Sequence, residues 1–364
     1  THTLHQQNIE LQRKMNSYWG DVVKKLTPYE PGEQPTNSLL LKLNTNENPY
    51  APSPKVLEAI KASVKESLRL YPDPESMNLK ASISDYYGLE TSNIFVGNGS
   101  DEILAFIFQA LLKKSRPIFF PDITYSFYPV YCNLFDIQYK TIPLDTEFKI
   151  NFADYGIDNG GIIFPNPNAP TGIPKSLKEI EELLKLNKDS VVVVDEAYVD
   201  FGTESAVNLV NQYKNLVVTQ SMSKSRSLAG MRLGFAFADQ GLIEALSRIK
   251  NSFNSYPVDR LAQEAGIAAI NDEDYFTETR ENIIEARTFL EKSLLELKFE
   301  TLPSGANFVF TKHHIMNASE IFKKLRDSGI LVRHFNNPER ISQYLRITVG
   351  TMKQMKQLIS ILKS

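Results

Sequence analysis

Hydrophobic positions along the chain fall into short continuous runs that alternate with longer stretches of helical spacing. Six runs are apolar at consecutive positions, which is typical of strands buried on both faces: NIFVG, RPIFF, GIIF, VVVVD, NLVVTQ and LGFAF. Helical spacing is clearest in SDEILAFIFQALLKK and LKEIEELLKLNK. Buried strands that alternate with helices predict an α/β fold, in which helices cover a mainly parallel sheet.

The beginning of the chain has a different pattern. Residues 1–45 combine a helical stretch with the turn-rich segment LTPYEPGEQP, whose three prolines and one glycine exclude a continuous helix. We interpret this part as an arm that lies on another surface, such as that of a neighbouring subunit. After it, the apolar positions from Pro54 to Leu70 fit an amphipathic helix, which the segment YPDP ends.

A second change of pattern, near residue 255, predicts a domain boundary. A long charged helical region over 259–298 precedes three short strands and a last helix that runs to Leu362. The strands are expected at NFVFT, ILVRH and LRITVG, so this part predicts a smaller α+β domain. The sequence therefore predicts three parts, which are an arm over 1–45, a large domain over 46–255 and a small domain over 256–364.

Composition and charge exclude several classes of protein. The chain has 40 Lys and Arg against 43 Asp and Glu, so its charge does not predict binding to nucleic acid or to acidic lipid. The longest apolar stretch, Ile103 to Leu112, is too short to span a bilayer. The single Cys132 excludes an intramolecular disulfide and a Cys-based zinc site. Because the first residues form no apolar signal core, we expect a reduced, cytoplasmic protein.

The five histidines do not predict a metal site. None has HExxH spacing, and the neighbours His313 and His314 point in different directions in either a helix or a strand. We therefore interpret the histidines as surface or partly buried residues. In an enzyme with this sequence, proton transfer is expected to use lysine, tyrosine or carboxylate groups.

Ligands of a doubly wound sheet bind beyond the carboxyl ends of its strands, so the residues that follow each strand are informative. After NIFVG, Ser100 and Asp101 begin a helix whose first N–H groups can bind an anion. A capped turn of this kind is common in α/β folds, and Glu102 occupies the place of the third glycine of a dinucleotide fingerprint. After GIIF, the segment NPNAPTG predicts a rigid loop.

Charged residues follow the next two strands. Asp195 closes the valine strand, and a carboxylate buried there needs a cationic partner, which a protonated ring nitrogen of a ligand can supply; a helix cap is the alternative. After NLVVTQ come Ser221, Ser223 and Lys224, with Arg232 eight residues past the lysine. The serines and the arginine can bind a phosphate, and the amine of the lysine between them can attack a carbonyl group. An isolated Ser-x-x-Lys is usually a solvated loop, but here several such groups occur in order along one sheet.

Together these residues describe a pyridoxal 5'-phosphate site. The chain resembles the fold-type-I aminotransferases of class I/II, and within them the subfamily that acts on histidinol phosphate. This resemblance implies a seven-stranded-type, mainly parallel sheet in the large domain. It extends from Leu26 to the C-terminus and rests on LTPYEPGEQP, LNTNENPY, RLYPDPES, VGNGSDEI, PDITYSFY, NPNAPTG, VVVVDEAY, SMSKSRSLAGMRLGF, NSYPVDRLAQ and YLRITVGT.

The resemblance implies a role for each residue around the cofactor. Lys224 would be the Schiff-base lysine and the acid and base of the 1,3-proton shift. Asp195 would pair with the pyridine nitrogen, and Tyr198 would hydrogen-bond the phenolic oxygen of the ring. Tyr125 would stack on the face of the ring. The phosphate would be bound by Ser100, Asp101, Ser221, Ser223 and Arg232.

Further implied roles concern the substrate and a second subunit. Tyr71 would reach the phosphate in the site of a partner subunit, so the resemblance implies a homodimer with shared sites. Arg346 would bind the substrate α-carboxylate through a bidentate fork. Tyr29 and Arg333 resemble the residues that meet the distal phosphate of histidinol phosphate.

One position departs from the pattern of the family. Many relatives have Asn directly before Pro-Thr-Gly, where this chain has Ala169. Either Asn168 supplies the contact to the ring oxygen from one residue earlier, or Tyr198 makes that contact with less help.

Three hypotheses about the reaction and its substrate remain open. The motif LTPYEPGEQP favours transamination between histidinol phosphate and 2-oxoglutarate. A lyase similar to threonine-phosphate decarboxylase and an aminotransferase for aromatic amino acids are the alternatives. A nicotinamide-dependent oxidoreductase is disfavoured, because the glycine fingerprint of such enzymes is missing.

Overall fold

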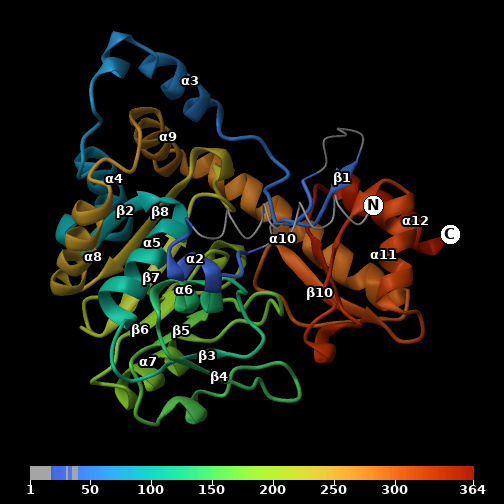
Figure 1. Cartoon of the computed structure of the whole chain (residues 1–364). Coiled ribbons are helices and arrows are strands. Elements are labelled where there is room, and N and C mark those ends of the chain that lie inside the picture. The colour runs from blue at the N-terminus through green and yellow to red at the C-terminus, as the bar shows by residue number, and fades with distance from the viewer. Residues whose placement is uncertain (1–17, 30–31, 35–39) are drawn as a thin grey trace, which may run out of the picture.

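The computed structural model describes residues 18–29, 32–34 and 40–364. The sequence predictions for residues 1–17, and for Pro31 and Pro35, lie outside the described residues. Figure 1 shows a larger body built on one sheet and a smaller body at the C-terminal end of the chain. This arrangement confirms the predicted combination of a large α/β part with a smaller α+β part.

The large part is organised around a seven-stranded sheet. All six predicted strands are present in it, and β4 is a further strand that was not predicted because three of its four residues are exposed. β8 runs antiparallel to both of its neighbours and the remaining pairs are parallel, which confirms a mainly parallel sheet. The strand order is β2 (Ile94–Asn98), β8 (Leu233–Ala238), β7 (Leu216–Ser221), β6 (Val192–Asp195), β5 (Ile162–Pro165), β3 (Ile118–Pro121) and β4 (Tyr139–Ile142).

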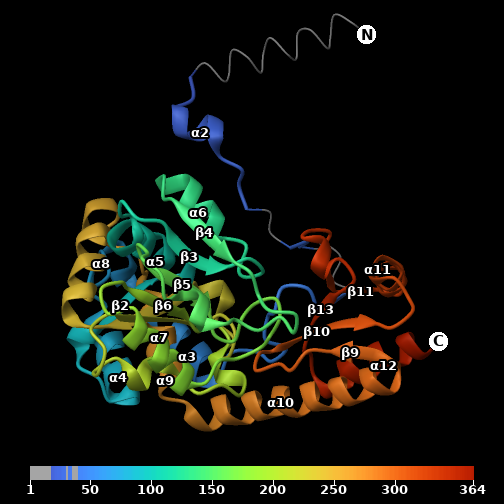
Figure 2. The same ribbon diagram turned by 90° about the horizontal axis from the view of Figure 1, so that it is seen from below.

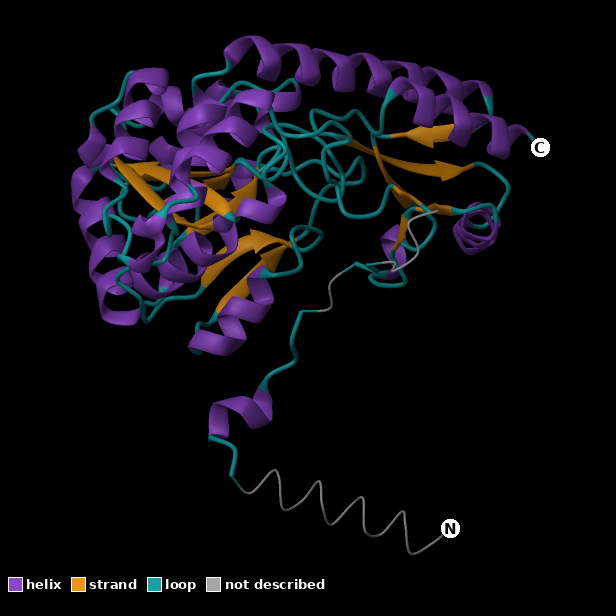
Figure 3. Ribbon diagram, turned by 90° about the horizontal axis from the view of Figure 1, so that it is seen from above, coloured by secondary structure: helices purple, strands orange, loops and turns teal. Residues whose placement is uncertain are grey.

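Helices cover both faces of this sheet, as Figure 3 shows. Consecutive residues of β6 point to opposite faces, so Val193 packs in one hydrophobic core while Val192 and Val194 pack in another. This double burial explains why the strand is apolar at every position. The covering helices are α3 (Pro54–Ser63), α4 (Met77–Tyr87), α5 (Gly99–Ile107), α6 (Tyr128–Phe135), α7 (Leu177–Leu186), α8 (Gln240–Phe253) and α9 (Arg260–Ile270).

The helix expected from Pro54 to Leu70 is shorter than predicted. It ends at Ser63, because Val64 has an extended backbone, and a separate 3-10 turn spans Glu66–Arg69. The apolar side chains beyond the break, including Leu68, are about half exposed, so no core stabilises a longer helix. The predicted helix after β2 also divides, since α5 continues as a π-helical turn at Phe108–Leu112.

The small part contains a four-stranded antiparallel sheet in the order β12 (Arg333–His334), β13 (Leu345–Thr348), β10 (Phe308–His313) and β9 (Phe299–Thr301). Its helices are α10 (Glu273–Glu296), α11 (Ala318–Asp327) and α12 (Met352–Lys363). The segment ILVRH supplies two strands that belong to different sheets. β11 (Ile330–Leu331) pairs in parallel with β1 (Leu41–Lys42), which ties the end of the arm to this part.

The charged helical region predicted over 259–298 is two helices, α9 and α10, separated at Asp272. α9 packs against α3 and α4, whereas α10 packs against α12 and β9 and lies along one side of the molecule in Figure 2. The predicted boundary at residue 255 therefore precedes a helix that packs in the large part, and the exact division into domains stays a prediction.

The beginning of the described arm stands away from the body of the molecule. The short helix α2 (Asp21–Lys25) has no buried residue and stands apart from both parts in Figure 2. Among the described residues, no helix has the length and apolar character needed to cross a bilayer.

Candidate active site

A cavity of about 730 Å³ lies at the carboxyl edge of the large sheet, where that edge faces the small part. Its walls come from the segments that follow β2, β3, β5, β6 and β7, together with β12, β13 and the arm. All the predicted site residues except Tyr71 and Asn168 line this cavity. The fold therefore brings together residues that are more than 300 positions apart in the sequence, such as Tyr29 and Arg346.

One end of the cavity is built to receive an anion. Ser100 and Asp101 lie in the first turn of α5, whose N–H groups have no acceptor within the helix. Arg232 lies beside them and its Nη2 donates to Asp101 Oδ2 at 3.1 Å. Gly99 has a φ of +80°, and a Cβ at this position would lie 2.6 Å from Arg232 Nη2. The positive φ favours glycine at this position, and the missing Cβ leaves room for the guanidinium where it now lies.

Asp195, at the end of β6, is buried and lines the same cavity. Its Oδ2 accepts a hydrogen bond from Tyr128 Oη at 3.0 Å, and its Oδ1 accepts one from Thr219 Oγ1 at 3.3 Å. Burial raises the pKa of the Asp195 carboxyl to about 6, while the two hydroxyls oppose that rise.

No ion pair to Asp195 is present within the described part of the chain. A buried carboxylate that has no cationic partner is costly, and a ligand in the cavity with a protonated ring nitrogen would neutralise its charge. The anion-binding turn at one end of the cavity and this carboxylate in its wall therefore fit the phosphate and the ring nitrogen of pyridoxal 5'-phosphate.

Lys224 reaches the cavity from the loop after β7. Its Nζ donates to the carbonyl oxygen of Thr45 at 3.2 Å and lies 5.8 Å from the centre of the Tyr198 ring. Asn48 Nδ2 donates to the carbonyl oxygens of Lys224 and Ser225, at 2.9 and 3.2 Å, and so holds the backbone of this loop. The amine is therefore placed by the segment 44–48 as well as by its own loop.

Tyr198 is also held by this segment. Asn46 is buried, has a φ of +56°, and its Nδ2 donates to Tyr198 Oη at 3.0 Å. Thr348, on β13, donates to Asn46 Oδ1 at 3.0 Å and accepts from Asn46 N at 3.0 Å. Because the phenol oxygen already accepts a hydrogen bond, its own hydrogen is left to donate into the cavity.

Two arginines face the cavity from the small sheet. Arg333 and Arg346 are directly opposite each other on β12 and β13. The Arg346 guanidinium lies near the rings of Phe308 and Phe335, at 5.4 and 5.8 Å, and donates to the carbonyl oxygen of Asn44 at 3.0 Å. Its Nε has no partner among the described residues. Burial, followed by the positive charge of Arg333, lowers the pKa of Arg346 from its ordinary value.

The arm supplies one wall of the cavity. The ring of Tyr29 lies 4.8 Å from that of Phe127, at the beginning of α6. A few residues later, Glu33 forms an ion pair with Arg326 of α11, in which Arg326 Nη2 donates to Glu33 Oε1 at 2.9 Å. The arm of this chain thus contacts the large part through Tyr29 and the small part through Glu33.

Two predicted residues lie outside the cavity. Tyr71 is 77% exposed and stacks on Tyr256, with ring centres 4.6 Å apart. Asn168 is buried behind the cavity wall, where its Nδ2 donates to Ile123 O and Thr171 Oγ1 while Ala169 lines the cavity. Their roles at a cofactor stay predictions.

Three residues that were not predicted from the sequence hold the predicted ones in place. Tyr128 and Thr219 bind Asp195, and Asn46 binds Tyr198. No sequence pattern marks Tyr128, which lies at the first residue of α6 and meets Asp195 only through the packing of that helix on the sheet. The contacts of Thr219 and Asn46 depend on strand pairing and loop packing, which the sequence pattern does not give.

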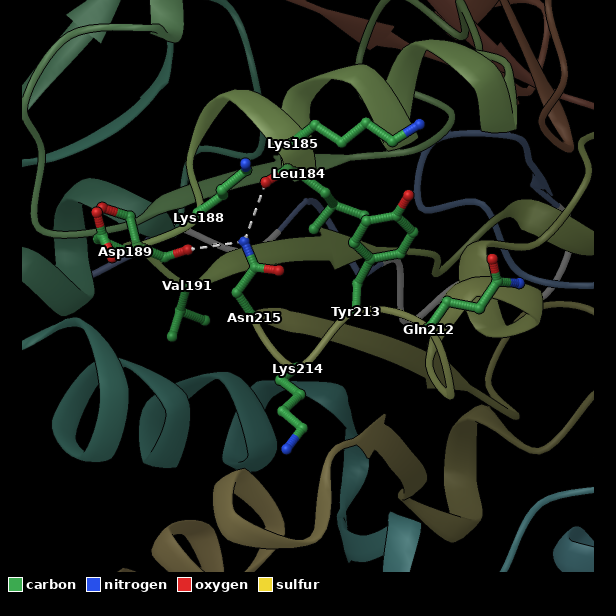
Figure 4. A pocket seen from close by; sticks show the side chains of 10 residues that line it. Leu184, Lys185, Lys188, Asp189, Val191, Gln212, Tyr213, Lys214 and Asn215 are labelled. Carbon is green, nitrogen blue, oxygen red and sulfur yellow. Dashed lines mark hydrogen bonds between the residues drawn. The ribbon is translucent and has the colours of Figure 1, made fainter.

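A second hollow, of about 470 Å³, lies at the opposite edge of the sheet (Figure 4). It is formed by residues that precede β6 and β7, including Lys188 and Lys214. Asn215 closes its floor by donating to the carbonyl oxygens of Leu184, Asn187 and Ser190. In Figure 4 the ammonium groups of Lys185 and Lys214 point in opposite directions, so they do not converge on one ligand. Ligands of such sheets bind at the other edge.

Comparison with known proteins places the chain in a family. The sequence profile described as "Aminotransferase class I and II" matches residues 39–362. The chain therefore belongs to the class I and II aminotransferases, the pyridoxal-phosphate-dependent class that its motifs resemble.

The descriptions of individual relatives are more specific than that of the family. The "Histidinol-phosphate aminotransferase 1" of Hydrogenovibrio crunogenus is 59% identical over 94% of this chain and 96% of its own length. The protein of the same description from Methylococcus capsulatus is 58% identical over 96% of this chain and 97% of its own length.

Solved structures share the fold at low sequence identity. A histidinol-phosphate aminotransferase from Sinorhizobium meliloti in complex with pyridoxal-5'-phosphate has a TM-score of 0.84 and 22% identity, over 95% of this chain and 98% of that one. An L-threonine-O-3-phosphate decarboxylase from Porphyromonas gingivalis has a TM-score of 0.74 and 22% identity, over 89% and 98% of the two chains. Both are similar in fold, so the fold does not separate transaminase from decarboxylase.

Proposed function

We propose that this protein transfers the amino group of histidinol phosphate to 2-oxoglutarate, with pyridoxal 5'-phosphate as cofactor. The observation that carries the proposal is the pair Arg333 and Arg346, which face one cavity together with Tyr29. Relatives that are 54–59% identical over nearly the whole chain, and that are described as histidinol-phosphate aminotransferases, support the same substrate.

The cofactor would lie between the turn at the start of α5 and Asp195. Arg232, Ser221, Ser223 and the first amides of α5 would bind its phosphate, and Asp195 would pair with its ring nitrogen. When bound, the group supplies an electron-withdrawing ring that stabilises negative charge on the substrate α-carbon. The negative charge of Asp195 keeps the ring nitrogen protonated and so supports that property.

The residues of this chain would orient the ring and move the proton. Tyr198 would donate its hydroxyl hydrogen to the ring oxygen, since Asn46 already donates to the tyrosine oxygen. This arrangement favours the reading in which Tyr198, and not Asn168, makes that contact. Lys224 would carry the cofactor and, once released by substrate, transfer the proton through Nζ, which lies beside the carbonyl oxygen of Thr45.

The negative charges of the two proposed substrates account for the presence of two arginines in the cavity. Histidinol phosphate has a phosphate but no carboxylate, whereas 2-oxoglutarate has two carboxylates. Both therefore bring negative charge that two neighbouring guanidinium groups can bind in turn. Arg346 would bind the α-carboxylate of 2-oxoglutarate, and Arg333 with Tyr29 would bind the distal phosphate of histidinol phosphate. An enzyme for aromatic amino acids would have less use for this second cationic group.

We also propose that the protein is a homodimer in the cytoplasm. Tyr71 is exposed and does not line the cavity of its own chain, so it would serve the cofactor phosphate of a partner subunit. The beginning of the arm, around α2, stands apart from the body of its own chain and would lie on the same partner.

The test is a comparison of amino donors with the purified, cofactor-loaded protein. Glutamate formation from 2-oxoglutarate is measured with histidinol phosphate, phenylalanine and threonine phosphate as donors. We expect kcat/KM to be highest for histidinol phosphate. Release of carbon dioxide from threonine phosphate would assign the protein to the decarboxylases, and a preference for phenylalanine would assign it to the aromatic enzymes.

A further inference from the structure

A buried tyrosine touches two of the residues assigned to the cofactor. Tyr128 lies in the first turn of α6 and is 0% exposed. Its Oη donates to Asp195 Oδ2 at 3.0 Å, and its ring packs edge-to-face on that of Tyr125, with centres 5.6 Å apart at 90°. Tyr128 does not line the cavity itself, so it acts on any ligand only through its neighbours.

Both oxygens of Asp195 are held by hydroxyl groups. Thr219 on β7 is the register partner of Asp195 on β6, and its Oγ1 donates to the second carboxylate oxygen at 3.3 Å. Each hydroxyl stabilises the ionised carboxylate, because a carboxylate accepts hydrogen bonds and a carboxylic acid presents one acceptor fewer. Each also fixes the plane of the carboxylate and so the direction in which its charge faces the cavity.

We propose that Tyr128, assisted by Thr219, is a positioning residue that keeps Asp195 ionised and aimed at the ring nitrogen of the cofactor. The proposal rests on the cofactor site described above and adds a role for two residues that do not touch the cofactor. It also explains why a tyrosine, rather than phenylalanine, is placed in an otherwise apolar core.

The surroundings of Asp195 give this role a measurable consequence. Burial raises the pKa of its carboxyl to about 6, and the Tyr128 hydroxyl is the largest influence that opposes the rise. The other titratable groups near it include Asp101 from α5 and Tyr125 and Tyr131 from the α6 side, and Lys224 and Arg232 line the same cavity. Of these, Asp101 raises the pKa further. Removing the Tyr128 hydroxyl should therefore move the titration of Asp195 to higher pH.

The experiment measures the affinity of the cofactor-free protein for pyridoxamine 5'-phosphate between pH 5 and 9, by calorimetry. This probe binds without a bond to Lys224, so the readout is independent of turnover. In the parent, affinity should fall as the pH decreases through the titration of Asp195. In Tyr128→Phe, the fall should begin roughly one pH unit higher, which is about a tenfold loss of affinity in that range. Thr219→Val should shift the profile in the same direction by less.

Two controls separate positioning from packing. Tyr155→Phe removes the hydroxyl of another buried tyrosine, which has no partner among the described residues and lies on the other side of the sheet. It should leave the profile unchanged. In the Asp195→Asn background, Tyr128→Phe should cause no further shift.

An unchanged profile in Tyr128→Phe, or an equal shift in the Asp195→Asn background, would overturn the proposal. Should Tyr128→Phe fail to fold, Thr219→Val gives the same test from the other oxygen, and an unchanged profile there would also overturn it. If the parent protein does not bind pyridoxamine 5'-phosphate at all, the proposed cofactor, and not the role of Tyr128, is wrong.

Discussion

Arg333 and Arg346 are directly opposite each other on neighbouring antiparallel strands, with both side chains on the cavity side of the sheet. Like charges placed in this way repel, and the pKa of Arg346 is lowered by burial and then by Arg333. An anion that binds between them relieves this repulsion. The arrangement therefore favours substrates with strong negative charge and disfavours neutral amino donors.

This relationship predicts the effect of Arg333→Ala on substrate choice. A charged hydrogen bond contributes about 1.5–3 kcal/mol, so kcat/KM for histidinol phosphate should fall roughly 10- to 100-fold. The value for phenylalanine should fall much less, because that donor has no distal phosphate. Arg248→Ala, which removes an exposed arginine paired with Glu244 on α8, is the matched control and should change neither value. Equal losses for both donors would show that Arg333 does not bind the phosphate.

The proposed role of Lys224 predicts where the cofactor is attached. Reduction of the loaded protein with borohydride, followed by peptide mapping, should find the pyridoxyl group on the peptide that contains Lys224. Lys224→Ala should lose about 100- to 10,000-fold in kcat, the range for removal of an acid–base group. Lys214→Ala, in the hollow at the other edge of the sheet, should retain activity. A label on any other lysine would refute the assignment of the site.

The exposure of Tyr71 predicts complementation between subunits. Lys224→Ala and Tyr71→Ala chains should each be nearly inactive when alone. If Tyr71 acts across the interface, a mixed dimer places both lesions in one site and leaves the other site intact. Activity should then partly return when the two chains are unfolded, mixed and refolded together. Verified mixed dimers without recovered activity would place Tyr71 in its own subunit's site.

The buried Glu196 predicts a pH dependence of stability. Burial raises the pKa of its carboxyl from an ordinary value near 4.5 to about 7, although Ser205, Gln220 and the amide of Ala206 donate to it. Because the folded pKa is above the unfolded one, the contribution of Glu196 to stability is complete below about pH 4.5. It is lost as the pH rises to about 7, which amounts to roughly 2 kcal/mol between pH 5 and 8.

The variant Glu196→Gln lacks this titration. Whatever its stability at pH 5, the difference in Tm between variant and parent should change in favour of the variant as the pH rises to 8. Thermal unfolding at pH 5, 6, 7 and 8 measures this trend. A constant difference, or one that moves in favour of the parent, would show that Glu196 does not titrate in this range.

The sequence predicted the residues that directly follow buried strands. Asp195 and Lys224 could be found because continuous apolar runs mark the strands, and the edge at which their ends meet follows from parallel pairing. Tyr128 and Asn46 could not be assigned roles in the same way. Each meets its partner across segments that are 67 and 152 positions apart, a contact that depends on tertiary packing.

Two errors in the predicted elements have one cause. The helix expected up to Leu70 was too long, and the edge strand Tyr139–Ile142 was missed, because in both cases hydrophobic spacing was taken as a measure of burial. The apolar residues near Leu70 remain exposed on the monomer, and the polar edge strand is stabilised by its pairing with β3. Spacing predicts an element well only where a core is present to bury it.

The segment 44–48 has a consequence for the geometry of the reaction. The carbonyl of Asn44 holds the Arg346 guanidinium, and the carbonyl of the next residue, Thr45, holds the Lys224 amine. Successive Cα atoms are about 3.8 Å apart, a spacing that covalent bonds fix. The Arg346 guanidinium and the Lys224 amine are therefore held by the carbonyl groups of two adjacent residues. One short segment of backbone therefore couples a side chain of the small part to a side chain of the large part.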